Sequence, residues 1–335
     1  MPIDMVKAVL QRLFTMGHGS SHYEGREEAE TEEEGDIGLS VAISEGDVVD
    51  AAGRMNTKMA AGVDGVPGEI AKLIASRRSE LVTRTFNGIT ESGRIPDGWK
   101  TARIILLRKP GKDPSLPNAY RPISILPTMS KIWEKCFKKI IERCIGMDPF
   151  HRRQHGFRKK RSTADAITQV MKFANICKQK QVICVMITLD ISNAFSSLSW
   201  KSIYEEFDKR KLPWKVKRLI GSYLSGRRII VSNQHGTAEH EVAAGIPQVS
   251  ILGPFLWNLV YDWLLERLDN MTMVRATSFA DELAITCSVG RNEEASAKVN
   301  TMLRIANDWC TSVGSPWREK RQRSCSSQAC ECREW

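Results

Sequence analysis

The sequence contains no apolar run long enough to cross a lipid bilayer, and its first twenty residues lack the small-residue cleavage pattern of a secretory signal peptide. It also lacks the evenly paired cysteines of a secreted disulfide scaffold, because its nine cysteines are odd in number and several lie inside apolar runs such as 182–189. Two histidine pairs have helical spacing, but neither is accompanied by a cysteine pair or an HExxH motif, which argues against a zinc site. These absences predict an intracellular protein.

Positive charge is in excess. The 335 residues include 49 Lys and Arg against 39 Asp and Glu, which gives a formal net charge of +10. This balance favours a partner with dense negative charge, nucleic acid above all, although an ordinary basic surface would give the same count. With 42% hydrophobic and 26% charged residues, the chain has the composition of a globular protein with one large domain or two closely packed subdomains.

The pattern of apolar residues predicts mixed helices and strands after an acidic run. Residues 24–36 are acidic and nearly free of apolar side chains, so residues 1–37 are expected to form a disordered leader and linker. Helical periodicity is found from residue 38, from 69, and at 130–145, 162–178, 200–211 and 292–310; strand patterns are found at 99–109, 182–189 and 228–232, with a hairpin at 273–289. This order indicates an α+β fold rather than a regular βαβ winding.

Acidic residues interrupt two of the predicted strands. Asp190 ends the apolar run VICVMITLD, and Asp281 with Glu282 lies inside SFADELAITCSV. A carboxylate directly after buried β-formers must be paired, solvated or bound to a metal ion. Two such acids could share divalent cations and support phosphoryl transfer, whereas each acid taken alone would more often be a loop cap.

The strings around these acids resemble a known family. LDISNAFSSLSW (189–200), AAGIPQVSILGPFLWNLVYD (243–262) and SFADELA (278–284) are similar, in this order, to the palm motifs of non-LTR retrotransposon reverse transcriptases. Upstream, KMAAGVDGVPGEI (58–70), KPGKDPSLPNAYRPISIL (109–126) and QHGFRKKRSTADAI (154–167) resemble the fingers motifs of that family, the jockey-like elements most closely. The similarity covers residues 40–314.

This resemblance implies the fingers and palm of a right-hand polymerase, with an antiparallel palm sheet packed on helices. We expect the fingers at about 38–180 and the palm at about 181–317. The segment 318–335 is rich in cysteine and charge without apolar periodicity, so an irregular tail is expected there, as if translated out of frame, and the thumb is expected to be truncated or absent.

Carried over position by position, the resemblance implies a catalytic metal site. Asp190 and Asp281 would be ligands, the Ile191 carbonyl a backbone ligand, and Glu282 would take the place of a second Asp. The implied cofactors are two Mg²⁺ ions, with Mn²⁺ as an alternative.

The resemblance also implies nucleotide contacts. Lys109 and Arg121 would meet the incoming triphosphate, which suits the point charge of Lys and the fork of Arg. Phe195, five residues after Asp190, would crowd a ribose 2′-hydroxyl and so favour deoxynucleotides, and Gln248 would lie at the nucleotide. On pattern alone, Phe195 could instead be a core residue and Arg121 a surface ion pair.

Template and primer contacts are expected from two segments. The basic connector 151–161 would hold the template backbone by charge, through Arg158, Lys159 and Arg161. The Gly/Pro loop 245–254 would bring backbone close to nucleic acid, with Gly245 and Ser250 beside template and primer. The alternatives are a solvated basic face and a plain helix entry.

Two departures from the family pattern concern the site. Glu282 stands where the family has Asp, which moves the carboxylate one methylene outward. Val249 stands where the family has Gly, and a β-branched side chain suits neither a positive φ nor close approach to a substrate.

The function that follows is RNA-directed DNA synthesis as part of a non-LTR retrotransposon. Its partners would be an RNA template, a DNA primer and deoxynucleoside triphosphates, and its location nuclear and cytoplasmic. The alternative is a catalytically impaired remnant of a mobile element that binds nucleic acid without turnover, which Val249, Glu282 and the tail favour. An RNA-directed RNA polymerase and a group II intron maturase share the palm, but Phe195 disfavours the first and the string LGPFLWNLVYD disfavours the second.

Overall fold

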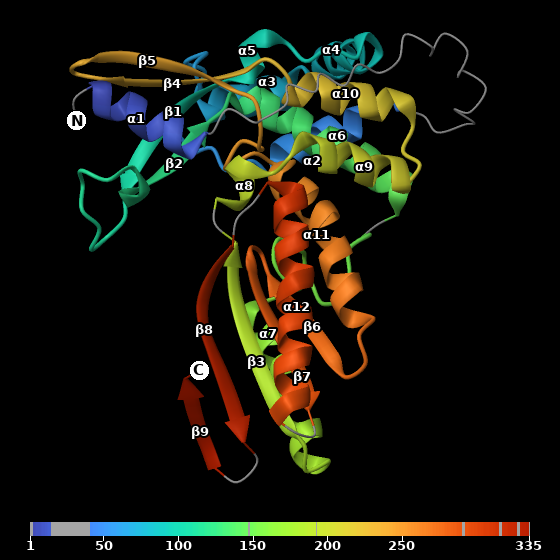
Figure 1. Cartoon of the computed structure of the whole chain (residues 1–335). Coiled ribbons are helices and arrows are strands. Elements are labelled where there is room, and N and C mark those ends of the chain that lie inside the picture. Colours follow the sequence, from blue (N-terminus) through green and yellow to red (C-terminus); the bar gives the residue numbers. More distant parts are fainter. Residues whose placement is uncertain are drawn as a thin grey trace. The chain divides into compact units, whose positions relative to one another are not determined.

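The computed structural model describes the residues in the ranges 3–14, 41–146, 148–191, 193–289, 292–314, 317–326 and 329–334. The chain forms two compact units, which are interleaved along the sequence (Figure 1). Unit 1 comprises residues 1–147 and 195–253, and unit 2 comprises 148–194 and 254–335. This division differs from the two consecutive parts expected with a boundary near residue 180. The cause is long-range strand pairing, which joins residues 183–190 to 282–289.

Unit 1 contains a mixed four-stranded sheet with the strand order β2-β1-β4-β5. The strands are β1 (Thr101–Arg108), β2 (Tyr120–Ile125), β4 (Arg227–Asn233) and β5 (Gly236–Val242). β1 pairs antiparallel with β2 and parallel with β4, and β4 forms an antiparallel hairpin with β5. A short 3₁₀ turn, η3 (Pro117–Ala119), leads into β2.

The N-terminal helix α1 (Ile3–Leu13) packs against this sheet. Val6, Val9, Leu10 and Leu13 recur at helical spacing and are buried in one cluster with side chains from all four strands. The expectation of a disordered segment over 1–37 is therefore wrong for residues 3–13, because the apolar face of this helix is buried against the sheet. The acidic run 24–36 lies outside the described residues.

Besides α1, unit 1 contains further helices. They are α2 (Glu45–Gly53), α3 (Gly68–Arg77), α4 (Ser79–Ser92), α5 (Asp97–Lys100), α6 (Thr128–Ile145), α8 (Ala194–Ser197), α9 (Trp200–Lys209) and α10 (Trp214–Leu224). Ser44 and Asp47 form a capping box at the start of α2, which satisfies two backbone N–H groups. In α6, Trp133 stacks on Phe137 with ring centroids 4.8 Å apart, and both side chains are fully buried.

A buried carboxylate joins α6 to the loop segment that precedes helix α11 (Gly253–Asp269). Glu134 is fully buried, and its Oε2 accepts hydrogen bonds from the backbone N–H groups of Ile251 at 2.7 Å and Leu252 at 3.1 Å. Burial raises the pKa of Glu134, while the Leu252 N–H and the nearby charge of buried Arg227 oppose this shift. Glu134 therefore fixes the C-terminal end of the loop at 245–252.

Unit 2 is built on a five-stranded antiparallel sheet with the order β6-β7-β3-β8-β9. Its strands are β3 (Ile183–Ile191), β6 (Val274–Phe279), β7 (Glu282–Val289), β8 (Trp317–Ser326) and β9 (Ala329–Glu334). Helix α7 (Thr163–Gln179) contacts β3, β6 and β7, and α12 (Asn292–Val313) contacts β7. Figure 1 shows β3 between β7 and β8. The predicted α+β fold with an antiparallel sheet packed on helices is confirmed.

Helix α11 is apolar around most of its circumference and forms the centre of unit 2. Trp257 and Tyr261 stack at 5.4 Å, and both meet Trp309 of α12 edge to face at 6.0 and 5.2 Å. All three rings are fully or almost fully buried, so they anchor both helices in one core.

The C-terminal segment differs from its expected irregular structure. Residues 317–326 and 329–334 form β8 and β9, and β8 pairs antiparallel with β3. Strand pairing satisfies the backbone N–H and C=O groups at the edge of β3, and these groups are independent of side-chain chemistry. Apolar periodicity is therefore a poor guide to a strand of this kind.

None of the helices in the described part of the chain is long and apolar enough to cross a membrane.

Replacing Glu134 with Ala should destabilise the protein by about 3–5 kcal/mol, because two backbone N–H groups lose their acceptor and buried Arg227 loses a nearby opposite charge. Urea unfolding measures this. Glu142→Ala is the matched control on the same helix, since Glu142 pairs with Lys138 in a partly exposed ion pair whose loss should cost less than about 1 kcal/mol. Equal losses in the two variants would contradict the anchoring role of Glu134.

Candidate active site

The three acids singled out in the sequence meet at one end of the β3–β7 pair. Asp190 lies directly opposite Glu282 in the antiparallel register, and the backbone N–H of Ile191 donates to the carbonyl of Asp281 at 3.2 Å. Directly opposite residues of an antiparallel pair project to the same face of the sheet. The register therefore brings Asp190 and Glu282 to one face, with Asp281 in the adjoining turn.

These acids differ in their exposure. Asp190 and Asp281 are half-buried, Glu282 is exposed, and Ile191 is buried. Beneath the turn, the pKa of the Tyr261 phenol is raised by burial, and the charges of Cys310 and Asp281 contribute to the same shift. Tyr261 is therefore a buried, uncharged phenol next to the site.

The donor set fits a hard divalent cation. Carboxylate oxygens are the preferred protein ligands of Mg²⁺, which commonly takes one or two of them and fills its remaining positions with water and substrate phosphates. Asp190 at the end of β3 and Asp281 in the turn before β7 supply this number. Within the described residues, no group of three or more His, Cys, Asp or Glu side chains is placed so that it could hold a metal ion.

The Gly/Pro loop after β5 packs against the segment after β3. Gly245 has a φ of +80°, its N–H donates to Leu198 O at 2.9 Å, and a Cβ at this position would overlap the Ser196 carbonyl oxygen. The N–H of Ile246 donates to Phe195 O at 2.6 Å. Two predicted site residues, Phe195 and Gly245, are therefore brought together, and glycine is required at 245 by both the positive φ and the close approach.

The remaining residues of this loop differ from one another in exposure. Gln248 is half-buried, whereas Ser250 is only 4% exposed and its Oγ accepts a hydrogen bond from Gly253 N at 2.8 Å. The predicted contact of Ser250 with template or primer disagrees with this geometry, because the hydroxyl is buried and caps the start of α11. The Ser–x–x–Gly spacing before an apolar helix is the sequence signal for this role.

Val249 occupies a strained backbone conformation. Its φ is +81°, and 41% of its side chain surface is exposed. A β-branched residue in this region is a steric outlier, and the exposed side chain gains little packing in return. The loop has kept the conformation that favours glycine although the residue is Val.

The cationic residues expected at a triphosphate lie on the β1–β2 hairpin of unit 1. Arg121 is exposed and pairs with Leu107 in the strand register, and Lys109 is half-buried with its backbone N–H bonded to Ala119 O at 2.7 Å. Arg121 lies on β2 and Lys109 directly follows β1, so both are near the same end of the hairpin. The carboxylates belong to unit 2.

In the basic connector, Arg158 differs from its predicted role. Its side chain is 4% exposed, it pairs with Asp148, and it donates to His151 O at 2.6 Å and Gln154 O at 2.8 Å. Because these partners use the donors of its guanidinium, Arg158 braces the connector and is not a free phosphate contact. Lys159 and Arg161 are exposed, as a contact with a template backbone requires.

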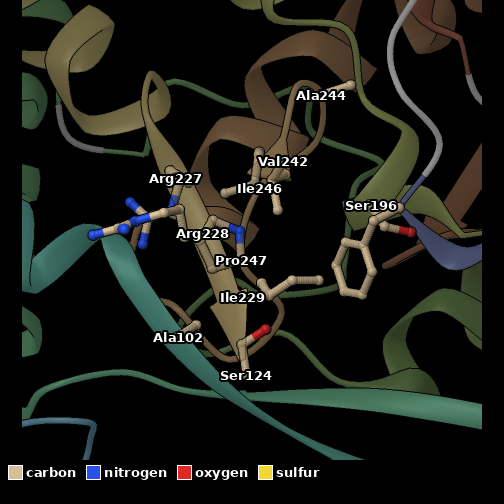
Figure 2. A pocket seen from close by; sticks show the side chains of 11 residues that line it. Ala102, Ser124, Ser196, Arg227, Arg228, Ile229, Val242, Ala244, Ile246 and Pro247 are labelled. Atoms are coloured by element: carbon tan, nitrogen blue, oxygen red, sulfur yellow. The ribbon is translucent and has the colours of Figure 1, made fainter. Parts of the chain in front are cut away.

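A small pocket in unit 1 adjoins the Gly/Pro loop (Figure 2). Ile229, Val242 and Ile246 gather around it, and its lining contains no Asp, Glu, His or Cys. The pocket therefore lies between the loop and β4, and its lining offers no carboxylate, imidazole or thiol for acid–base chemistry or metal binding.

Comparison with known proteins identifies the class to which this geometry belongs. The sequence profile of the family described as "Reverse transcriptase (RNA-dependent DNA polymerase)" matches residues 107–321. The chain therefore belongs to the reverse transcriptase family.

Its relatives are proteins of non-LTR retrotransposons. The chain is 29% identical over 262 residues to the 115 kDa protein in type-1 retrotransposable element R1DM of Drosophila melanogaster, covering 78% of this chain and 25% of that protein. It is 29% identical over 220 residues to the RNA-directed DNA polymerase from mobile element jockey of the same species, covering 65% and 24%. The chain thus spans about a quarter of the length of both relatives. The predicted resemblance to jockey-like reverse transcriptases is confirmed.

A solved structure supports the fold. Apo telomerase from Candida tropicalis, truncated from its C-terminal domain, matches with a TM-score of 0.51 at 12% identity, over 80% of this chain and 67% of that chain. The predicted fingers and palm fold of a reverse transcriptase agrees with this likeness.

Replacing Val249 with Gly should raise the free energy of unfolding by about 1 kcal/mol, because the steric cost of the positive φ disappears and little buried surface is lost. Val242→Gly is the control in the same loop region. Val242 ends β5 without a positive φ and packs partly buried against the sheet core, so glycine there should lower stability by more than about 1 kcal/mol. Urea unfolding of both variants checks this, and a loss of stability in Val249→Gly would show that the loop does not require the left-handed conformation.

Proposed function

We propose that this chain is the polymerising module of a non-LTR retrotransposon reverse transcriptase and copies RNA into DNA by nucleotidyl transfer. The observation that supports this most strongly is the β3–β7 register, which sets Asp190 opposite Glu282 and beside Asp281. Family membership and two-carboxylate geometry point to the same chemistry.

Asp190 and Asp281 would hold two Mg²⁺ ions, with Mn²⁺ as a substitute, and the Ile191 carbonyl would add a backbone ligand. When bound, such ions lower the pKa of a primer 3′-hydroxyl and neutralise charge on the phosphates during an in-line displacement. The end of β3 and the turn before β7 would hold these carboxylates in place. Glu282 is exposed and one methylene longer than Asp, so its role would be to adjust charge at the site rather than to bridge the cations.

The nucleotide would be oriented by cationic and aromatic groups. Arg121 is exposed and its planar fork suits two phosphate oxygens, while Lys109 supplies a point charge. Phe195 is half-buried beside the Gly245 loop, where a fixed ring would exclude a 2′-hydroxyl and favour deoxynucleotides. Gln248 would complete this group from the same loop.

The template would be held by Lys159 and Arg161, with the backbone at Gly245 close to the primer. Both cations are exposed on unit 2, and phosphate contacts of this kind carry no sequence information. An RNA template, a DNA primer and deoxynucleoside triphosphates would therefore be the partners.

Primer extension on an RNA template with Mg²⁺ and deoxynucleotides tests this function. Asp190→Asn should reduce extension at least about a thousandfold, because a metal clamp contributes several kcal/mol to the barrier. Asp208→Asn is the matched control, since this Asp is more than half exposed and pairs with Lys217 on the surface of unit 1. Its extension should equal that of the unchanged protein.

Equal extension by the Asp190 and Asp208 variants would contradict the proposed role of Asp190. If the unchanged protein extends no primer while Val249→Gly does, the chain is an impaired polymerase whose loop limits turnover. If neither extends a primer, the proposal of polymerase activity is wrong for this chain.

Removing the two exposed cations should weaken binding to single-stranded RNA and make its salt dependence shallower. For Lys159→Ala with Arg161→Ala, the slope of log K against log salt should fall by about 1.4, which is two phosphate contacts at about 0.7 each. Fluorescence anisotropy with labelled RNA measures it. Lys201→Ala, at an exposed residue of unit 1, is the control and should leave the slope unchanged. An unchanged slope in the double variant would exclude this surface as the template contact.

A further inference from the structure

The segment 153–156 lies along the free edge of β6, beside the turn that contains Asp281. Gln154 and Ser278 form a parallel bridge, in which His155 N donates to Ser278 O at 2.8 Å and Ser278 N donates to Arg153 O at 3.0 Å. The segment therefore adds backbone pairing to the strand that leads directly into the turn.

Beyond the bridge, two buried side chains converge on a single carbonyl of this turn. The Trp257 indole N–H donates to Ala280 O at 3.2 Å, and the Gln154 amide donates to the same oxygen at 3.4 Å. Both side chains are fully buried. Because these two donors come from α11 and from the 153–156 segment, the Ala280 carbonyl is held from two directions.

Gly156 lies against the backbone of Ala280. A Cβ at this position would overlap the Ala280 backbone nitrogen, so only glycine lets the two backbones approach this closely. Gly156 is itself fixed, since its N–H donates to Gln154 Oε1 at 2.9 Å and its carbonyl accepts from Asn258 Nδ2 at 3.1 Å. One hydrogen-bonded network around the turn thus connects Gln154, Gly156, Trp257, Asn258 and Ala280.

Ala280 needs such support because its φ is +59°. An L-residue in this region costs about 1–2 kcal/mol and persists only where the surroundings determine it. The peptide that these contacts hold is the one that joins Ala280 to Asp281, so its orientation sets the direction of the Asp281 carboxylate.

From these contacts we infer that Gln154, Gly156 and Trp257 are positioning residues for Asp281, and that they set the affinity of the site for divalent cations. The inference rests on the proposed function, in which Asp281 is a metal ligand. Partners that orient ligands typically change metal affinity about 10- to 100-fold when they are lost. Misplacement of a reacting group by about 1 Å can cost about a hundredfold in rate.

Substitution of the two core tryptophans separates positioning from simple packing. Trp257→Phe keeps an aromatic ring and removes the N–H that reaches the turn. Trp309→Phe is the matched control, because Trp309 lies in the same aromatic cluster and is equally buried, but its N–H donates to Val260 O on α11 at 3.4 Å. Gln154→Met is a second variant that removes the other donor without changing the aromatic core.

The measurement is Mn²⁺ binding to the protein with a template–primer duplex, followed by electron paramagnetic resonance, with thermal melting recorded in parallel. Trp257→Phe should weaken Mn²⁺ binding by about tenfold or more, Gln154→Met should weaken it in the same direction, and Trp309→Phe should leave it unchanged. Both tryptophan variants should melt at similarly lowered temperatures.

Equal Mn²⁺ affinity in all three variants and the unchanged protein would overturn the positioning role. So would equal weakening by Trp257→Phe and Trp309→Phe, since that result would indicate general loosening of the core. The variant Asp281→Asn distinguishes a failure of the proposed metal site from a failure of the positioning role. If it binds Mn²⁺ as tightly as the unchanged protein, the proposed metal site itself is wrong and the inference falls with it.

Discussion

The pairing of β3 with β7 is the constraint on which the rest of the structure depends. These strands lie about a hundred residues apart in the chain, and their antiparallel register alone sets Asp190 opposite Glu282. A shift of one residue would move every side chain of a strand to the opposite face, so the buried set including Ile187, Leu189 and Ile285 fixes the register as firmly as it fixes the core. The site is thus a consequence of the hydrophobic pattern of the two strands that carry it.

The structure holds several residues in left-handed backbone conformations. Ala280 precedes Asp281, Val249 lies in the Gly/Pro loop, and Asn193 follows β3. Such residues each cost about 1–3 kcal/mol and tend to gather at functional sites, where the surrounding contacts determine the backbone. In this chain the surrounding contacts can be named. Glu134 anchors the end of the Gly/Pro loop, and Gln154 with Trp257 anchors the turn before Asp281.

Local patterns predicted the elements on which the acids lie, because these elements carry strong apolar runs. The strand expected at 182–189 is β3 at Ile183–Ile191, and the hairpin expected at 273–289 is β6 and β7. Helix α1 was missed because its apolar stripe precedes an acidic run, and β8 and β9 were missed because backbone pairing on β3 needs no apolar pattern. The interleaved units depend on long-range pairing, which a linear scan of the chain does not contain.

Among the residues of the site, those in motifs were also predictable, whereas those that depend on long-range contacts were not. Asp190, Asp281 and Glu282 were found from their motifs, and the structure brings them to one end of the strand pair. Arg158 and Ser250 were expected at the substrate because of their residue types, but burial and internal hydrogen bonds occupy them. Trp257 and Gln154 lie inside quoted motif strings, yet their contact with Ala280 appears only when α11 and the 153–156 segment fold beside the turn.

The central claim is that the β3 end and the turn before β7 hold a divalent cation together, and cleavage of the backbone by bound Fe²⁺ tests it most directly. Iron with ascorbate and peroxide generates radicals that cut the chain close to the metal. Cuts are expected near Asp190 and near Asp281, both suppressed by excess Mg²⁺ and both absent in Asp281→Asn. Cuts confined to other segments, or cuts at these positions that Mg²⁺ does not suppress, would contradict it.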